Sequence, residues 1–464
     1  MFKKIEIWIL YLTILLSILF ALGFGVLVRQ EIEGITKKGI LDISFLSKPA
    51  AYLARLPEQF LKEVIGPNVN MVNAFRENRS FFGQSGFDGT PNDIESFLLL
   101  SRYDGNLQEA VVELVDLTNF EILHIWNPDI DAFNDMVANI DEFKFIKRDK
   151  NNSRSRIIHP KLLSDGGLIF LDDTPLRKID TCSNLIFQNT RDKFHHSIET
   201  DVDGNIWVPS RLYPQSLPIE KVGRQLVEDE MGFNDDAIVK ISPDGEILFE
   251  KSVSQIFIDN GLEYLLFSVG DIHFDVDPIH LNDIQPVNFD GDFWKKGDVF
   301  LSLRHQSMVL LYRPLTNEII WKGTGPFFHQ HDVDILDNYR ISIFNNNSKH
   351  FINGDVADIH NEVIIYNFKT SEYSSYLKDS LVKNEVRTIT EGRSQILLNS
   401  DLFIEESNYV RYLYFNEDGS LRWTYVNGAD DGNVYSIGWS RILYTKEDIR
   451  NVHNLLRNKE ACDE

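Results

Sequence analysis

The chain has 464 residues, more than one ordinary single-core domain holds but well suited to one large repeat domain with an appendage. Hydrophobic residues make up 43% of the chain, aromatic residues 12% and charged residues 25%, which is the composition of a folded protein. Its 46 Lys and Arg against 70 Asp and Glu give a net charge of -24, and this acidic excess excludes nucleic acid as a bulk partner, because phosphate binding needs a basic face.

The N-terminal segment, residues 1–30, is predicted to be a cytoplasmic tip followed by a transmembrane anchor. IWILYLTILLSILFALGFGVLV (7–28) contains no charge, and at about 1.5 Å per residue it spans about 33 Å, enough to cross a bilayer core. Lys3 and Lys4 precede this stretch, so the positive-inside bias predicts that the remainder of the chain lies on the extracytoplasmic (periplasmic or extracellular) side. No A-x-A-like cleavage site follows it, which favours an uncleaved anchor over a cleaved signal peptide.

Residues 31–90 are expected to form a membrane-proximal helical segment. SKPAAYLARLPEQFLKEVIG (47–66) carries apolar residues at helical spacing and is flanked by Pro49 and Pro67. A stalk or cap and a helix packed on the main domain are both compatible with this pattern.

One β-rich pattern then recurs six times along residues 91–445. Each unit has alternating or β-branched residues, a polar turn and a second run that ends in an aromatic residue. The units lie at 111–126, 176–187, 238–249, 308–321, 363–373 and 410–423. Six units at this period predict an all-β fold, a six-bladed β-propeller with four-stranded blades, followed by a C-terminal helical tail at 446–464. An open sandwich is the competing all-β fold, but it gives no reason for a long repeat.

A second pattern precedes these hairpins: a histidine or arginine, about six residues, a tight turn and a strand. In a propeller the first strand of each blade lines the central channel, so equivalent positions converge around the axis. The residues at this position are His159, His196, His280, His331 and Arg393. We expect them to meet at one mouth of the channel.

The two cysteines, Cys182 and Cys462, are far apart in the sequence and lack zinc-site spacing. They form no disulfide framework, so they constrain the redox compartment little, and a single long-range bridge stays open.

The stretch FFHQHDVDILDN places His329 and His331 on one face of a strand, because residues i and i+2 share a face. A structural role is one interpretation, since entry strands of propellers use such side chains to bond turns of neighbouring blades. A zinc site is the second, with a third imidazole completing the set, although no cysteine joins it and Asp332 and Asp334 lack a recognisable ligand spacing.

Covalent group transfer is the third interpretation of the histidine cluster. A neutral imidazole is a good nucleophile toward sulfuryl or phosphoryl centres. The transfer also needs donors on the non-bridging oxygens and an acid-base partner for the leaving and attacking oxygens. Besides the histidines, Asn282 and Arg304 are candidates, because a planar guanidinium suits a tetrahedral oxyanion.

The segments FHHSIETDVDGNIWV, HLND, LSLRHQS, HQHDVDILDN and GRSQILL resemble the arylsulfotransferase (arylsulfate sulfotransferase) family over roughly residues 95–445. The resemblance implies a six-bladed propeller that moves a sulfuryl group from a phenolic sulfate ester to a phenol. The family does this without a nucleotide donor, by a ping-pong route through a sulfohistidine.

Carried over by motif, the nucleophile of the family falls on His331, and its His-x-Asn pair falls on His280 and Asn282. Its Ser-x-Arg arginine falls on Arg304. The early His-His motif places a further site histidine at His196, with His195 as the second choice.

The sequence departs from this family in three places. Bacterial members usually carry an N-terminal β-sandwich domain, whereas this chain has an apolar segment and a helical stretch. Cys182 and Cys462 do not match the disulfide near the family's active site. Asn345, Asn346 and Asn347 stand where an Asp-Asn-Gly turn is expected.

Together these observations predict a membrane-anchored sulfotransferase in which His331 attacks the sulfur of an aryl sulfate. Arg304 and Asn282 hold the developing charge, and His280 and His196 act as acid-base partners or oxygen donors. The substrate-binding candidates are Asn282, His195, His159 and Arg393. His159, Arg393 and Gln395 are expected to line the channel, where a structural role is the more common one.

The expected partners are an aryl sulfate donor, a phenolic acceptor and the membrane; no metal or organic cofactor is needed, and a homodimer is one arrangement that the sequence allows. The alternatives are a non-catalytic ligand-binding or scaffold propeller, and a metal-dependent hydrolase that uses the pair His329 and His331.

Overall fold

The structure is a computed structural model of the chain. It describes residues 6–32, 44–65, 71–72, 84–140, 143–191, 193–222, 232–268, 275–351, 354–357, 360–458 and 462. The expected cytoplasmic tip at 1–5, and residues 33–43, 66–70 and 73–83 of the expected helical segment, lie outside them. Two compact units are formed, one by the N-terminal helices and one by the remainder of the described chain.

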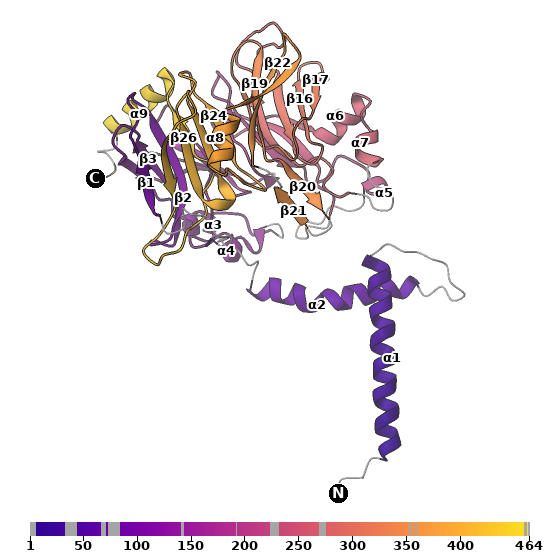
Figure 1. Cartoon of the computed structure of the whole chain (residues 1–464). Coiled ribbons are helices and arrows are strands. Elements are labelled where there is room, and N and C mark those ends of the chain that lie inside the picture. Colours follow the sequence, from indigo (N-terminus) through magenta and orange to yellow (C-terminus); the bar gives the residue numbers. More distant parts are fainter. Residues whose placement is uncertain are drawn as a thin grey trace. The chain divides into compact units, whose positions relative to one another are not determined.

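The N-terminal unit consists of α1 (Ile7–Ile32), a 3-10 turn (Ser44–Leu46) and α2 (Ser47–Ile65), and α1 and α2 contact each other. Residues 7–30 of α1 are unburied and apolar, and 24 helical residues are long enough to span a bilayer, as a membrane anchor or a signal sequence. In α2, Ala50 and Ala51 are buried, whereas Leu53 and Phe60 are exposed. Figure 1 shows both helices.

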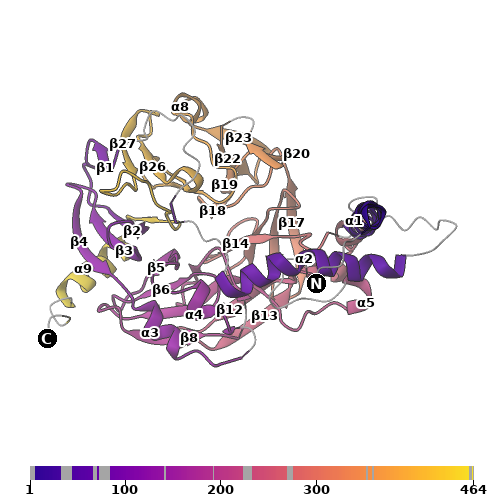
Figure 2. The same ribbon diagram turned by 90° about the horizontal axis from the view of Figure 1, so that it is seen from below.

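The second unit is a β-propeller, and six sheets surround its axis (Figure 2). From the axis outward, blade 1 contains β28 (Arg441–Leu443), β2 (Phe97–Asp104), β3 (Glu109–Asp116) and β4 (Glu121–Trp126). Blade 2 contains β5 (Ile158–Leu162), β6 (Leu168–Leu171), β7 (Leu176–Ile179) and β8 (Leu185–Asn189). Blade 3 contains β10 (Glu199–Thr200), β11 (Ile206–Arg211), β12 (Asp236–Ile241) and β13 (Ile247–Ser252), with β9 (Lys193–Phe194) paired to β11.

Blade 4 contains β14 (Leu281–Pro286), β15 (Val299–Leu303), β16 (Met308–Arg313) and β17 (Glu318–Thr324). Blade 5 contains β18 (Val333–Ile335), β19 (Arg340–Asn345), β22 (Glu362–Asn367) and β23 (Glu372–Tyr376), and the hairpin β20 (Ser348–Phe351) and β21 (Gly354–Ala357) leaves it after β19. Blade 6 contains β24 (Arg393–Ile396), β25 (Leu402–Glu406), β26 (Arg411–Phe415), β27 (Leu421–Val426) and a fifth strand, β1 (Gly86–Gly89).

The predicted six-bladed propeller is confirmed, and the six hairpins of the sequence are the third and fourth strands of the six blades. Successive residues of one strand point to opposite faces of the sheet and pack against the two adjacent blades. In β2, Phe97 and Leu99 belong to the core shared with blade 2, whereas Leu98 and Leu100 belong to the core shared with blade 6. This two-sided burial explains why the middle strands read as continuous apolar runs.

The ring is closed twice by segments from the two ends of the chain. Strand β28 supplies the innermost strand of blade 1, where Ile442 pairs with Leu98. Strand β1 extends blade 6, where Gly86 pairs with Val426. Gly89 has a φ of 126°, and a Cβ there would lie 2.3 Å from the carbonyl oxygen of Arg422, so this pairing requires glycine. Each closure ties blade 1 or blade 6 to residues from the other end of the chain.

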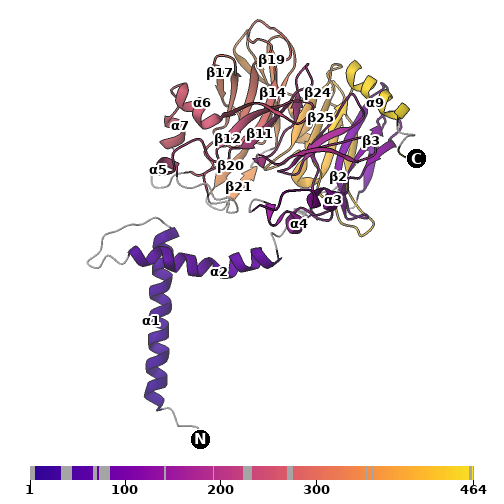
Figure 3. The same ribbon diagram turned by 180° about the vertical axis from the view of Figure 1, so that it is seen from behind.

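Helix α9 (Lys446–Asn458) covers the outside of blades 1 and 2, with Val452 and Leu455 in their core (Figure 3). Beyond it, Cys462 forms a disulfide with Cys182 in the β7–β8 turn, across 280 residues of sequence. The single long-range disulfide that the sequence allowed is therefore present. The remaining helices are short: α3 (Ile130–Asp135), α4 (Ile146–Asp149), α5 (Ile219–Val222), α6 (Val253–Asp259), α7 (Tyr264–Phe267), α8 (Lys378–Lys383) and the 3-10 turn Ser407–Tyr409.

Candidate active site

The histidines lie at the mouth of the channel where the inner strands begin. His159, His196, His280 and Trp439 stand at or just before the inner strands of four different blades, with φ of 48°, 62°, 54° and 56°. A left-handed backbone is uncommon for residues other than glycine, so its recurrence at equivalent positions is a feature of this fold. The ring centroid of His196 lies 5.1 Å from that of His280 and 6.4 Å from that of His331.

His331 is buried, and both of its ring nitrogens have partners. Nδ1 lies 2.7 Å from Oδ1 of Asn346, whose Nδ2 donates to the carbonyl oxygens of Thr388 and Glu391. Those two bonds fix the orientation of the amide, so Oδ1 accepts and His331 Nδ1 carries the proton. Nε2 accepts the backbone N–H of Glu391 at 3.0 Å. His331 is thus held as the neutral Nδ1–H tautomer, with its lone pair on Nε2.

The electrostatic surroundings also keep His331 neutral. Burial, and after it the positive charge of Arg304, lower the pKa of His331 well below its ordinary value, although the bond to Asn346 opposes them. Burial lowers the pKa of His196 in the same way, and the neighbouring His195, His280 and His331 add to the effect. The site therefore favours uncharged imidazoles, the form in which histidine is a nucleophile or a base.

His280 is oriented by a carboxylate. Its Nδ1 lies 2.7 Å from Oδ2 of Asp277, so the proton lies on Nδ1 and Nε2 is left for other contacts. Burial acts to raise the pKa of Asp277, but the hydrogen bond from His280 and the nearby positive groups outweigh it and lower that pKa. For His280, burial outweighs the carboxylate and the pKa is lowered.

The guanidinium of Arg304 is held beside this pair by His305. Nη1 of Arg304 donates to Nε2 of His305 at 2.8 Å, and Nδ1 of His305 donates to the carbonyl oxygen of Asp277 at 2.6 Å. The rings of His305 and His280 stack with centroids 4.4 Å apart. Arg304, Asp277 and the two histidines therefore form one connected group.

His196 is backed by a second carboxylate. Its Nδ1 lies 2.7 Å from Nδ1 of His195, and Nε2 of His195 lies 3.4 Å from Oδ1 of the fully buried Asp236. Neither of these last two atoms has a hydrogen-bond partner in the described part of the chain, but the charge of Asp236 favours the proton of His195 on Nε2. In that tautomer Nδ1 of His195 accepts and Nδ1 of His196 donates. We call this row of three side chains the relay of Asp236, His195 and His196. It leaves the lone pair of His196 on Nε2.

The remaining candidates of the sequence make contacts between blades. His159 accepts the backbone N–H of Ile198 in blade 3 at 2.9 Å, and its Nε2 lies 2.6 Å from Nη1 of Arg393. Asn282 donates to the carbonyl oxygen of Gln330 at 3.0 Å. The side chain of Gln395 makes two bonds to the backbone of Ile442, each 3.0 Å long.

Oδ1 of Asn282 is buried and has no hydrogen-bond partner in the described part of the chain. Asn282 is thus fully buried, with one of its amide N–H groups already bound to Gln330 of the next blade.

A metal ion does not fit the best cluster of ligands. Among the described residues, Asp277, His280 and His305 offer ligand atoms within 4.8 Å of one another. Arg304 has only donors, so Nε2 of His305 must accept and Nδ1 must carry a proton. A metal on that Nδ1 would move the proton to Nε2, where it would face the guanidinium. The pair proposed from sequence, His329 and His331, belongs to no such cluster among the residues that the structure describes.

Several site residues were missed by sequence reasoning. Asn346 lies in the asparagine run that was noted only as a departure, and Asp277 precedes His280 by three residues. His305 follows Arg304 directly, and this adjacency was its available signal. Arg211, at the end of β11, lies 3.7 Å from Asp236 and contributes to lowering the pKa of His196 and of Asp277. Glu391 and Trp439 come from other blades and carry no local signal.

These features define a β-propeller protein with a histidine-rich site at the mouth of its channel. Residues 159–428 match the model of the arylsulfotransferase (ASST) family, and the chain belongs to this family. The match supports aryl sulfotransferase activity in general, and the suspected resemblance is confirmed. No curated protein matches the sequence.

Solved structures match the chain at low identity and low TM-score. A protein of unknown function from Bacteroides caccae is 10% identical, with a TM-score of 0.44 over 75% of this chain and 99% of that chain. A streptogramin B lyase is 9% identical, with a TM-score of 0.36 over 78% and 99%. The WD40 propeller domain of Doa1 is 10% identical, with a TM-score of 0.38 over 82% and 98%.

Proposed function

We propose that this protein transfers sulfuryl groups from aryl sulfate esters to phenols without a nucleotide, through a sulfohistidine on His331. The observation that carries the proposal is the state of His331: a neutral, buried imidazole whose proton is held on Nδ1 by Asn346. A nucleophile of this kind needs its lone pair on the opposite nitrogen, and here Nε2 has it. Membership of the arylsulfotransferase family supports the same chemistry.

In the first half of the reaction, Nε2 of His331 attacks the sulfur of the aryl sulfate. The hydrogen bond from the backbone N–H of Glu391 to this nitrogen breaks and the N–S bond forms. The S–O bond to the aryl group breaks, and the phenolate oxygen leaves with the bonding electrons. Arg304, which His305 holds in place, neutralises charge on the sulfuryl oxygens. The negative charge of the bound aryl sulfate also raises the pKa of His280, whose cation Asp277 already favours. The Nε2–H of this cation then donates to a sulfuryl oxygen.

His196 handles the proton of the phenol oxygen. The charge of the bound sulfate ester promotes protonation of its Nε2, and this proton passes to the leaving phenolate. In the second half, the acceptor phenol returns a proton to His196 while its oxygen attacks the sulfur, and the N–S bond breaks. Nδ1 of His331 keeps its proton throughout. His196 takes up one proton from solvent when the donor binds and releases one to solvent when the product ester leaves, so the free enzyme is regenerated. The relay of Asp236 and His195 positions His196 and stabilises its cation.

The other candidates have supporting roles in this proposal. Asn282 directs its remaining amide N–H toward a sulfuryl oxygen, and His159 and Arg393 hold blades 2, 3 and 6 at the distance that the site requires.

We further propose that α1 anchors the propeller on the extracytoplasmic side of a membrane, with α2 as the membrane-proximal segment. The disulfide between Cys182 and Cys462 supports this side, since such bridges persist in oxidising compartments and are rare in the cytosol.

The test uses the full-length protein in detergent with p-nitrophenyl sulfate and a phenol, without any nucleotide. We expect release of nitrophenol that depends on the phenol, and an acid-labile mass increase of one sulfuryl group on the peptide that contains His331. The matched variants are His331→Ala and His329→Ala, because His329 is a half-buried neighbour whose ring lies beside His305. On the order of 10⁴-fold loss is expected for the first variant and little loss for the second. A propeller that binds without turnover would release no nitrophenol.

A further inference from the structure

A pocket of about 90 Å³ opens beside the histidine cluster. Trp439, Ile158 and Ile437 form its apolar wall, and His196 faces into it. The indole of Trp439 is buried, and its ring centroid lies 5.9 Å from His196 and 6.1 Å from His331. Engineered cavities of about 150 Å³ bind a benzene ring, so an open pocket of this size suits one aromatic ring with part of it in solvent.

The rim of this pocket carries charges of both signs. Arg156 lies 3.6 Å from Glu391, and Asp173 lies 2.9 Å from Lys150. Lys150 also pairs with Asp172 at 3.0 Å. Among the residues that line the pocket, two carboxylates, Asp173 and Glu391, therefore stand against one cation, Arg156, which Glu391 already pairs.

We propose that this pocket is the aryl subsite of the transfer reaction and that its rim selects uncharged or cationic phenols over phenols that carry a carboxylate. The inference rests on the proposed function for the reaction itself. A ring against Trp439 places its phenol oxygen at His196, the one histidine among the pocket-lining residues. An anionic substituent at the far end of the ring would meet Asp173 and Glu391 and would gain little from Arg156, because Glu391 already neutralises it.

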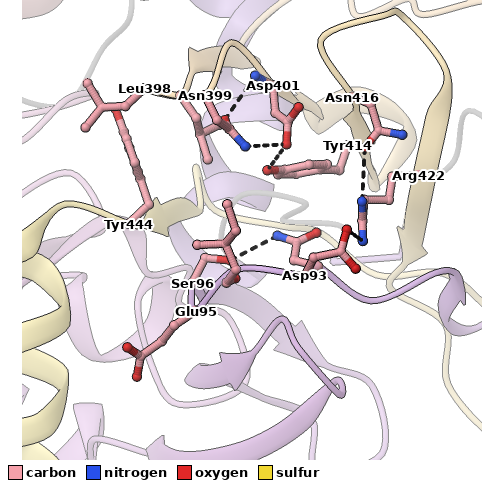
Figure 4. Close-up of a pocket in the computed structure, with 13 residues that line it drawn as sticks. Asp93, Glu95, Ser96, Leu398, Asn399, Asp401, Tyr414, Asn416, Arg422 and Tyr444 are labelled. Carbon is pink, nitrogen blue, oxygen red and sulfur yellow. Dashed lines mark hydrogen bonds and ion pairs between the residues drawn. The ribbon is translucent and has the colours of Figure 1, made fainter.

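A larger pocket of about 340 Å³ lies at the other end of the blades, and it makes a control (Figure 4). It is lined by residues 92–96 and by the β24–β25 and β26–β27 turns. Strands β24 and β26 run toward these turns and away from the histidines. Its charged groups have partners on the chain: Asp93 pairs with Arg422 at 2.8 Å, and Asp401 accepts from Tyr414 at 2.9 Å. This pocket therefore offers charge changes that are remote from the reaction.

The experiment compares three acceptors whose phenol groups have similar acidity: tyramine, p-cresol and 4-hydroxyphenylacetate. With p-nitrophenyl sulfate as donor, kcat/KM for 4-hydroxyphenylacetate should be about five-fold lower than for p-cresol, the size of an exposed charge interaction near 1 kcal/mol. Glu391→Gln frees Arg156 and should close this gap, whereas Arg156→Gln should widen it. Asp93→Asn should leave the ratio unchanged.

A binding measurement separates the subsite from the reaction. Calorimetric titration of the His331→Ala protein with p-cresol should show binding that is weakened when Trp439→Phe is added, irrespective of any turnover. If Glu391→Gln and Arg156→Gln alter acceptor selectivity no more than Asp93→Asn does, the subsite is wrong even where transfer is observed. If p-cresol binds with this dependence on Trp439 while no acceptor is sulfated, the subsite stands and the proposed function fails.

Discussion

Oδ1 of Asn346 lies 2.7 Å from Nδ1 of His331, 15 residues earlier in the same blade. Strand β19 ends at Asn345, and the backbone N–H of His331 donates to the carbonyl oxygen of Phe344 at 3.0 Å. The hairpin register therefore brings the asparagine beside the imidazole. Because the amide of Asn346 is itself fixed by two carbonyl oxygens, it can only accept from His331.

The first prediction concerns this bond. Asn346→Ala removes the acceptor, so only the backbone N–H of Glu391 still favours the Nδ1–H tautomer. In part of the molecules the proton then moves to Nε2, where it blocks the lone pair. We expect kcat to fall by about 10²-fold or more with a small change in KM, since a wrong tautomer affects the reacting state more than binding. Nitrogen NMR of labelled histidine should show the Nδ1–H tautomer in the wild type and a mixture in the variant. An unchanged tautomer together with reduced kcat would contradict the assigned role.

The second prediction is the pH dependence of the first half-reaction. The pKa of His331 is lowered, so its imidazole stays neutral as the pH falls below about 6.5, the ordinary value for histidine. With p-nitrophenyl sulfate, whose leaving group needs no proton, kcat/KM should be flat at neutral pH and above and should decline in acid with an apparent pKa below about 6.5.

A charge variant checks the cause of this shift. Arg304→Gln removes the positive charge that disfavours the imidazolium of His331, and Asn346→Asp adds a negative charge that favours it. Both should move the acid limb to higher pH, whatever they do to the maximal rate. A limb that stays in place in both variants would assign it to another group.

The third prediction tests the relay of Asp236, His195 and His196. His195→Phe keeps a ring in the same volume but removes the acceptor for Nδ1 of His196, and Asp236→Asn removes the charge while keeping an acceptor for the backbone N–H of Leu281. With phenyl sulfate, whose leaving group needs a proton, kcat should fall by about 10²-fold.

The donor with the better leaving group supplies the control for this relay. With p-nitrophenyl sulfate the same variants should lose little activity, because nitrophenolate leaves without general acid catalysis. Equal losses with both donors would show that His195 and Asp236 serve only the folding of blade 3.

The parts of the molecule that could be predicted from sequence are those encoded locally. The third and fourth strands of each blade are recognisable by alternation, a turn and a closing aromatic residue. Four entry histidines and Arg393 mark five inner strands. His331 and His280 follow from the same register. In contrast, β28 has three residues and pairs with β2 far away in the sequence, so no local pattern identifies its partner.

The missing half of the site lies between blades. Glu391 reaches His331 from blade 6, and Trp439 reaches it from the entry of blade 1. Which loop faces which histidine depends on how adjacent blades are rotated, and a single sequence does not encode that rotation in any short motif. The asparagine run shows the limit of motif reasoning, since residues noted as a departure from a turn include the group that orients His331.

The last prediction concerns Glu405, which joins blade 6 to the closing strand. Its carboxyl accepts the backbone N–H groups of Trp439 and Ser440 at 2.9 and 2.7 Å. Burial raises the pKa of Glu405 to about 7, although these bonds, the bond from Ser407 and the charge of Arg393 oppose the shift. In the unfolded chain the pKa is near 4.3.

Because the folded pKa is the higher one, Glu405 contributes stability that is fully present below about pH 4.3 and is lost as the pH rises through about 7. The total is on the order of 3 kcal/mol for a shift of this size. Glu405→Gln cannot titrate, so the free energy of unfolding should decline less between pH 5 and pH 8 in the variant than in the wild type. Urea unfolding of both proteins at the two pH values measures this difference, and the other titrating groups cancel in the comparison. If the free energy of unfolding declines equally in the wild type and the variant, Glu405 is ionised throughout and the closing strand is held by a charged carboxylate.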